Sequence, residues 1–242
     1  MNLPQIIFSA MAALIALTLH EFAHGYIAYK LGDDTARSLG RLSLNPLKHL
    51  DPFGALCMVF FHFGWAKPVP INPRNFKNPR KGFALTALAG PVTNLVTGFF
   101  TILIYLICLK LFKQSDNNLM NNIYSNILLF LWCFFSINIG LGVFNLIPIP
   151  PFDGSRIVNV ILPQKLYFKV MKYERQIYWG VIAWLLLGRY VYHALLSIPF
   201  VADNQILSQI FKIFSLSDIL NDAIQIIAGG MIKFWTLFPF LR

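Results

Sequence analysis

Charged residues are scarce in this chain. Of its 242 residues, 12% are charged and 57% are hydrophobic, whereas an ordinary soluble domain has about 25% charged and about 45–50% apolar residues. So few charges cannot cover a water-facing surface, which excludes an ordinary soluble enzyme. Aromatic residues make up 15% of the chain, and this excludes a disordered protein, in which aromatic residues are rare. The composition indicates a single membrane-embedded domain over residues 1–242.

Cysteine is also rare, and acidic residues are few relative to basic ones. The three cysteines, Cys57, Cys108 and Cys133, lie in apolar stretches, and such an odd and scattered set gives no disulfide framework. There are 20 basic and 10 acidic residues, for a formal net charge of +10. In a soluble protein this excess would suggest a nucleic-acid partner, but in a membrane protein basic residues collect in cytoplasmic loops. We therefore expect the lipid bilayer, and no nucleic acid, as a partner.

Long apolar runs predict transmembrane helices, because a span needs roughly 20 mainly apolar residues. We expect an all-α polytopic membrane protein with about 4–6 transmembrane helices. Its motif-bearing core covers about residues 3–160, with residues 1–19 as the start of a mature helix, and its C-terminal helices cover about 177–242. The end of the chain from 223 to 241 contains Lys233 and predicts either a further span or an amphipathic hairpin. The four clearest apolar runs are 3–29, 83–111, 123–147 and 177–200.

The basic residues assign the two sides of the membrane. Nine lie in residues 30–81 and five lie from Arg156 to Arg175, so these two connections hold 14 of the 20. The connection between the second and third runs contains only Lys110 and Lys113. Because basic residues favour cytoplasmic loops, loops 30–81 and 154–176 are predicted to be cytoplasmic and the N-terminus to lie outside.

The first cytoplasmic loop is predicted to carry structure of its own. Short extended stretches begin at Arg41 and at Lys67, and they predict a small β-hairpin or sheet at the membrane surface. The uncharged stretch Pro52–Trp65 is too short to cross a membrane, so we expect a re-entrant segment there. Residues Lys67–Ile71 are the candidate edge of that sheet, to which an extended peptide strand could add.

An H-E-x-x-H motif, His20-Glu21-Phe22-Ala23-His24, lies near the end of the first apolar run. Residues four apart share one face of a helix, so His20 and His24 can bind one Zn²⁺ while Glu21 beside them acts as a general base. Three ionisable side chains in an apolar span are costly and indicate a functional site. The alternative is a polar patch that is hydrogen-bonded between helices.

A catalytic zinc site usually has three protein ligands and one position for water. The longer H-E-x-x-H-x-x-G-x-x-H pattern is absent, because positions 27 and 30 do not hold the required Gly and His. The one other glutamate, Glu174, lies among basic residues, which leaves an aspartate or a remote histidine such as His49 or His62. Asp153 is favoured, since it follows a Pro-rich break at the cytoplasmic end of the third apolar run. Its alternative is an Asp-Gly turn at the interface.

These motifs together resemble the site-2 protease family of intramembrane zinc metalloproteases. The resemblance rests on H-E-x-x-H and on the downstream Asn-x-x-Pro-x-Pro-x-x-Asp-Gly from Asn145 to Gly154. Three further stretches, 41–49, 64–72 and 89–94, are similar to the compact bacterial members. We expect a compact member without the PDZ or CBS domain that many members add.

The resemblance implies the role of each site residue. It makes His20, His24 and Asp153 the ligands of one Zn²⁺ per chain and Glu21 the catalytic base. It further implies that Asn94 and Asn145 hold the substrate backbone or the oxyanion.

The predicted function is zinc-dependent hydrolysis of peptide bonds in the transmembrane segments of other proteins, near the cytoplasmic face of a bacterial plasma membrane. A metal-ion transporter with His20, His24 and Asp153 as transit ligands is one alternative, and a catalytically inactive homologue is another. Glu21 distinguishes the protease from the transporter, because a transporter needs no general base.

Overall fold

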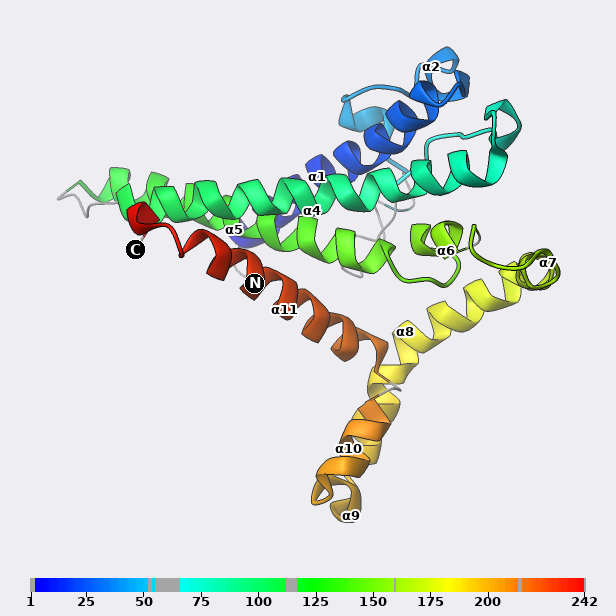
Figure 1. Ribbon diagram of the computed structural model, residues 1–242. Coiled ribbons are helices and arrows are strands. Elements are labelled where there is room, and N and C mark those ends of the chain that lie inside the picture. The colour runs from blue at the N-terminus through cyan, green and yellow to red at the C-terminus, as the bar shows by residue number, and fades with distance from the viewer. Residues whose placement is uncertain are drawn as a thin grey trace.

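Three long helices form the body of the protein. The computed structural model describes residues 3–51, 54, 66–111, 117–158, 160–212 and 215–241. Helices α1 (Leu3–Lys30), α4 (Pro79–Leu111) and α5 (Asn118–Asn145) pack against one another, and α4 runs opposite to the other two (Figure 1). Each is long and apolar enough to cross a membrane. The predicted all-α membrane protein is confirmed for the part of the chain that is described.

The ends of these helices follow local chemistry. Helix α1 ends before Gly32, whose φ of 106° is favourable for glycine alone, and the Asp33 N–H then donates to the Ala28 carbonyl at 2.9 Å. Helix α4 begins at Pro79, a residue that suits the first turn because it lacks an N–H. The Asn117 side chain accepts from two backbone N–H groups at the start of α5. Each span begins or ends within a few residues of its predicted limit.

Among the described residues, three helices are long and apolar enough to span a membrane. A fourth span is present if the two segments of α8 (Glu174–Leu196), bent by 46° relative to each other, count as one, so the described residues reach only the lower end of the expected four to six. Helix α11 (Leu216–Trp235) includes Asp218, Asp222 and Lys233 and is not among the candidate spans. Three charged residues in 20 make it a poor membrane span.

The predicted β-hairpin in the loop after α1 is not found among the residues described there. That loop has α2 (Thr35–Ser38), two short 3₁₀ helices, η1 (Pro46–Lys48) and η2 (Pro73–Asn75), and one isolated antiparallel bridge between Leu50 and Ala66. The prolines at positions 68 and 70 cannot donate to a ladder, which explains why pairing stops at the bridge. The predicted re-entrant segment, Pro52–Trp65, lies outside the described residues apart from Gly54.

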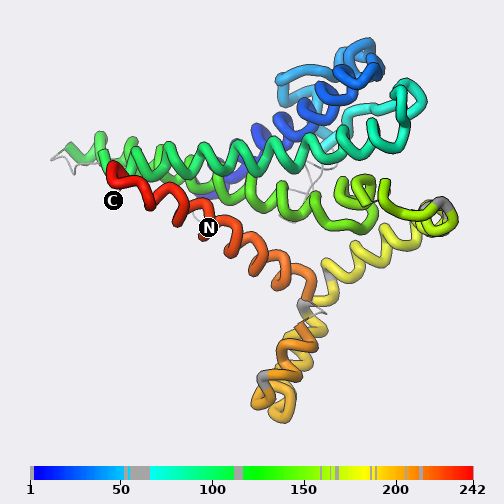
Figure 2. The backbone as a smooth tube through the Cα atoms, viewed as in Figure 1, coloured from blue at the N-terminus to red at the C-terminus, as the bar shows by residue number. Residues whose placement is uncertain are grey.

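The C-terminal third departs from the three-helix body. After α6 (Asp153–Val158) and α7 (Gln164–Lys172), helix α8 leads away to an arm with α9 (Pro199–Ala202) and α10 (Gln205–Phe211) (Figure 2). Helix α11 then returns, and the last short turn is η4 (Pro239–Leu241). Side chains of α11 pack on the apolar cluster of α4 and α5, whose fully or nearly fully buried members are Ile102, Phe135, Ile139 and Val143.

Candidate metal centre

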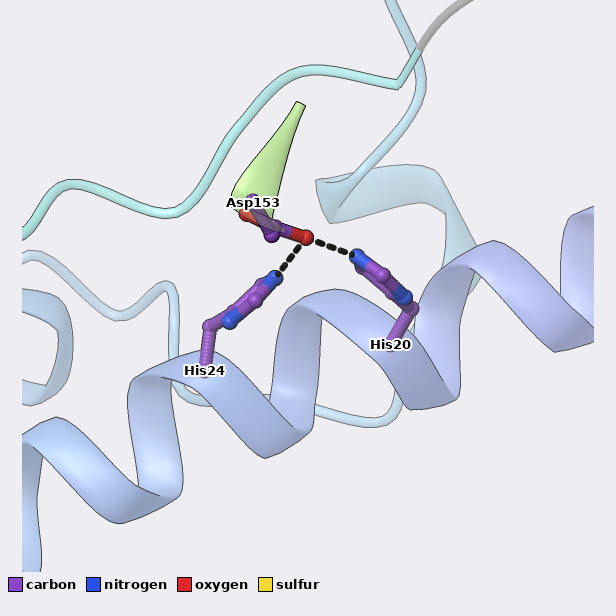
Figure 3. Close-up of side chains that lie close together, drawn as sticks. All are labelled: His20, His24 and Asp153. Carbon is purple, nitrogen blue, oxygen red and sulfur yellow. Dashed lines mark hydrogen bonds and ion pairs between the residues drawn. The ribbon is translucent and has the colours of Figure 1, made fainter. Parts of the chain in front are cut away.

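Two helices bring three ligand side chains together. His20 and His24 project from one face of α1, and Asp153 points at both from the first turn of α6 (Figure 3). The Asp153 Oδ2 atom lies 3.1 Å from Nε2 of His20 and 3.2 Å from Nε2 of His24. Two ligand atoms that bind one tetrahedral Zn²⁺ at about 2.1 Å lie about 3.4 Å apart. The three side chains therefore fit a zinc ion, and among the described residues they are the one such group.

The position of Asp153 depends on a close backbone approach. Helix α5 ends at Asn145, and the chain turns through Pro150 and Pro151, which are joined by a cis peptide bond, before α6 begins. A Cβ atom on Gly154 would lie 2.3 Å from the Leu146 carbonyl oxygen, so no other residue fits there. The close packing of Gly154 against the end of α5 thus sets the position of the neighbouring Asp153 carboxylate.

A relay of two asparagines lies behind His20. The Nδ1 atom of His20 is 2.5 Å from Oδ1 of Asn94, and Nδ2 of Asn94 donates to the Ala16 carbonyl and to Oδ1 of Asn138. Asn138 donates in turn to the Phe134 carbonyl. Both asparagines are fully buried.

The directions of these hydrogen bonds fix the state of the imidazole. Backbone carbonyls can accept but not donate, so the amide nitrogens of Asn138 and Asn94 must face Phe134 and Ala16. Oδ1 of Asn94 is then the acceptor, and Nδ1 of His20 carries the proton. This tautomer leaves the Nε2 lone pair directed toward Asp153, which is the state that a metal ligand requires.

His24 is oriented by the backbone. Its Nδ1–H donates to the Thr86 carbonyl at 2.7 Å, which again leaves Nε2 free to bind a metal. Helix α4 can approach the two imidazoles this closely because its residue 90 is glycine. A Cβ atom there would lie 2.5 Å from Nε2 of His24 and 2.6 Å from Nε2 of His20.

A cavity of about 400 Å³ opens beside the three ligands. Glu21 and Asn145 line it together with the ligand side chains. Oε2 of Glu21 accepts from the Val69 N–H at 2.8 Å, and one N–H of the Asn145 amide donates to the Leu141 carbonyl. The cavity therefore combines a metal set, a carboxylate and an amide in one place.

The site has an anionic ligand. The Asp153 carboxylate carries a negative charge, and its Oδ2 atom faces the Nε2 atoms of both imidazoles. The carboxylate side chain is 24% exposed, against 5% and 7% for the two imidazoles. A cation is thus favoured between the three side chains.

The structure brings five of the six predicted site residues to the cavity and sets the sixth behind it. Asn94 lies on the far side of His20, where it is hydrogen-bonded to His20, Ala16 and Asn138. His49 is buried with its Nε2 donating to the Ser43 carbonyl and is not in the metal group. His62 lies outside the described residues.

Sequence reasoning missed the partners that support these residues. Asn138 gave a signal, because an asparagine within an apolar span suggests a function. The Thr86 carbonyl and the Val69 N–H gave none, because every residue type offers the same backbone groups.

Two buried histidines on an apolar helix and a partly exposed aspartate, with the carboxylate of Glu21 beside them, define the chain as a membrane protein with the site of a metallopeptidase. Comparison with known proteins supports this assignment. Residues 112–188 match the model of "Peptidase family M50". The "Putative zinc metalloprotease YwhC" of Bacillus subtilis is 36% identical over 210 residues, which cover 85% of this chain and 93% of that protein. The chain therefore belongs to peptidase family M50, the site-2 protease family.

Two further relatives match over shorter lengths. The "Putative zinc metalloprotease Rip2" of Mycolicibacterium smegmatis is 32% identical over 34% of this chain and 34% of its own length. The "Zinc metalloprotease MJ0392" of Methanocaldococcus jannaschii is 29% identical over 65% of this chain and 35% of its own length. No solved structure matches the chain significantly.

Proposed function

We propose that this protein is a zinc-dependent intramembrane endopeptidase that hydrolyses peptide bonds in transmembrane segments near the cytoplasmic face. The observation that carries the proposal is the convergence of His20, His24 and Asp153 beside Glu21 in one cavity. The relatives named as zinc metalloproteases support zinc as the metal. One ion per chain is the expected stoichiometry.

The roles of the residues follow from their chemistry. His20, His24 and Asp153 would hold Zn²⁺, which when bound lowers the pKa of a coordinated water to about 7 and polarises a carbonyl. Glu21 takes a proton from the attacking water and passes it to the leaving amine. Asn145 lines the cavity and would donate to a substrate carbonyl.

Asn94 has a different proposed role from the one that resemblance suggests. Its Oδ1 atom faces His20, and its amide nitrogen donates to Ala16 and Asn138. We infer that Asn94 orients a zinc ligand and does not contact the substrate. An oxyanion would need the N–H groups that Asn94 already gives to these two acceptors.

The membrane setting determines what kind of substrate can react. A helical segment offers no accessible peptide bond, since each carbonyl is bonded to an amide four residues on. The substrate must therefore unwind next to the cavity. The predicted topology, with the N-terminus outside and loops 30–81 and 154–176 in the cytoplasm of a bacterial cell, puts cleavage near the cytoplasmic surface.

The test combines metal content with cleavage. Wild type, Glu21→Gln, His24→Ala and Asp153→Ala are purified and reconstituted in lipid vesicles with a set of single-span membrane proteins. We expect about one zinc per chain in wild type and Glu21→Gln, clear loss of zinc in the other two, and cleavage by wild type alone.

Each departure from that pattern has a distinct meaning. Zinc retained in Asp153→Ala would remove the third ligand from the proposal. Metal flux into the vesicles that survives Glu21→Gln, without cleavage, would favour a transporter. Cleavage that survives Glu21→Gln would contradict the assigned base.

A further inference from the structure

One backbone N–H from the cytoplasmic loop reaches the proposed base. Val69 donates from its main chain to Oε2 of Glu21 at 2.8 Å, across 48 residues of sequence. Val69 is 6% exposed and lines the cavity that contains the three ligands. The loop segment Lys67–Ile71, hereafter the PVP segment, therefore lies directly against Glu21.

Two prolines limit the number of backbone donors in the PVP segment. Pro68 and Pro70 stand on either side of Val69, and neither has a backbone N–H. The Lys67 N–H already donates to the His49 carbonyl at 2.8 Å. Within residues 67–70 both N–H groups are thus engaged by the protein, which argues against this stretch as a donor edge for a substrate strand.

The PVP segment is fixed at both of its ends. Nη2 of Arg41 donates to the carbonyls of Lys67 at 2.8 Å and Pro68 at 3.2 Å. Just past the other end, the Asn72 N–H donates to Oδ2 of Asp33 at 2.7 Å. Asp33 is itself fully buried. Hydrogen bonds therefore hold the PVP segment in place on each side of Val69.

We propose that the PVP segment is a positioning element for Glu21, with Val69 and Arg41 as its positioning residues. The inference rests on the proposed function, because it assumes that Glu21 is the base. A glutamate on a helix can adopt many rotamers, and an N–H that binds Oε2 selects one of them and leaves Oε1 to receive the proton from water. Arg41 acts through Val69 by setting where the N–H points.

The decisive pair of variants is Val69→Pro and Val69→Ala. Proline removes the N–H and keeps an extended backbone, whereas alanine keeps the N–H and shortens the side chain. Zinc content, kcat and KM are measured for both in the reconstituted full-length protein. We expect Val69→Pro to lower kcat by about 10–100-fold with KM and zinc nearly unchanged, the size typical of lost support for a site residue. Val69→Ala keeps the N–H and should therefore lower kcat much less than Val69→Pro.

A second pair covers the case in which Val69→Pro does not fold. Arg41→Met removes the two hydrogen bonds to the segment, and Arg41→Lys can restore one of them. We expect a lower kcat in Arg41→Met, partial recovery in Arg41→Lys, and unchanged zinc in both. A residue that serves stability alone would change the melting temperature and leave kcat per folded molecule unaffected.

The outcomes separate this inference from the proposed function. Equal kcat in Val69→Pro and Val69→Ala, both with zinc bound, would overturn the positioning role and leave the protease intact. A higher kcat in Val69→Pro would also overturn it, because the contact would then restrain the base. If Val69→Pro is unfolded, an unchanged kcat in Arg41→Met overturns the role. Absence of Glu21-dependent cleavage in wild type would instead reject the proposed function.

Discussion

Asn138 and Ile139 are neighbours on α5, yet they belong to two differently packed regions. Asn138 meets Asn94 in a buried polar interface between α1, α4 and α5 that ends at His20. Ile139 packs in the apolar cluster with Ile102 and Phe135, which α11 covers. The hydrogen bonds of the polar interface are directional, so each one orients the next group. Apolar contact depends instead on shape and area. One region therefore sets the geometry of the site, and the other sets how firmly the helices pack.

The largest expected effect comes from Gly90→Ala, which places a methyl group in the polar region. Its Cβ atom would meet the imidazoles of His20 and His24 at 2.5–2.6 Å. The rings cannot move away without leaving Asp153 and their hydrogen-bond partners, so we expect zinc affinity to fall by more than about 100-fold. The measurement is zinc retention against a competing chelator.

Gly98→Ala on the same helix is the matched control. Its Cβ atom would meet Cδ1 of Ile139 at 2.5 Å, in the apolar region. A flexible side chain can shift, so we expect overpacking that costs about 1–3 kcal/mol of stability with zinc affinity preserved. Equal loss of zinc in both variants would show that the two regions are not separate.

The next effect is that of Asn138→Leu, which breaks the relay without touching a ligand. Leucine has the same branched heavy-atom skeleton as asparagine but cannot accept from Asn94, so the Asn94 amide loses one of the contacts that fix its direction. We expect zinc affinity to fall by about 10–100-fold, with a smaller change in melting temperature than in zinc binding. Unaltered zinc affinity would mean that the contact between Asn94 and Ala16 orients His20 without help.

A smaller effect is expected from Ile139→Val in the apolar region. The variant removes one methylene from a fully buried side chain and should cost about 0.5–1.5 kcal/mol of stability. Thermal unfolding in detergent measures the cost, and chelator competition should give the zinc affinity of wild type. A loss of zinc in Ile139→Val would show that the apolar cluster also supports metal binding.

The smallest effect concerns pH and the loop that carries Val69. Burial acts to raise the pKa of Asp33, but hydrogen bonds from Thr35, Asn72 and Asn75 outweigh it and hold that pKa below its usual value. Because the folded pKa is depressed, the carboxylate contributes stability above its unfolded pKa of about 3.9 and loses it as pH falls through the lower folded value.

Comparison of wild type with Asp33→Asn measures this contribution. Limited proteolysis measures how well the loop is protected in each protein. The difference in protection between wild type and Asp33→Asn should be constant above about pH 5 and should shrink below about pH 4. A difference that grew as the pH fell would contradict the assigned sign.

Much of the fold and part of the site follow from the sequence, residue by residue. The apolar runs predicted α1, α4 and α5 closely, because a membrane span must be long and apolar. The H-E-x-x-H spacing predicted that His20 and His24 share a face, because the helix period brings positions four apart together. The β-hairpin prediction failed because Pro68 and Pro70 outweighed the extended character of the stretch.

The sequence by itself predicted that His20 and His24 could hold a metal and determined that the chain is a membrane protein, since helix period and composition are local properties. Tertiary structure alone decided that Asp153 meets both histidines, that Asn94 faces His20 and that the Val69 N–H reaches Glu21. These contacts join residues 48 to 133 positions apart. They depend on where helices cross and on backbone groups that every residue shares, and no spacing in the sequence encodes either.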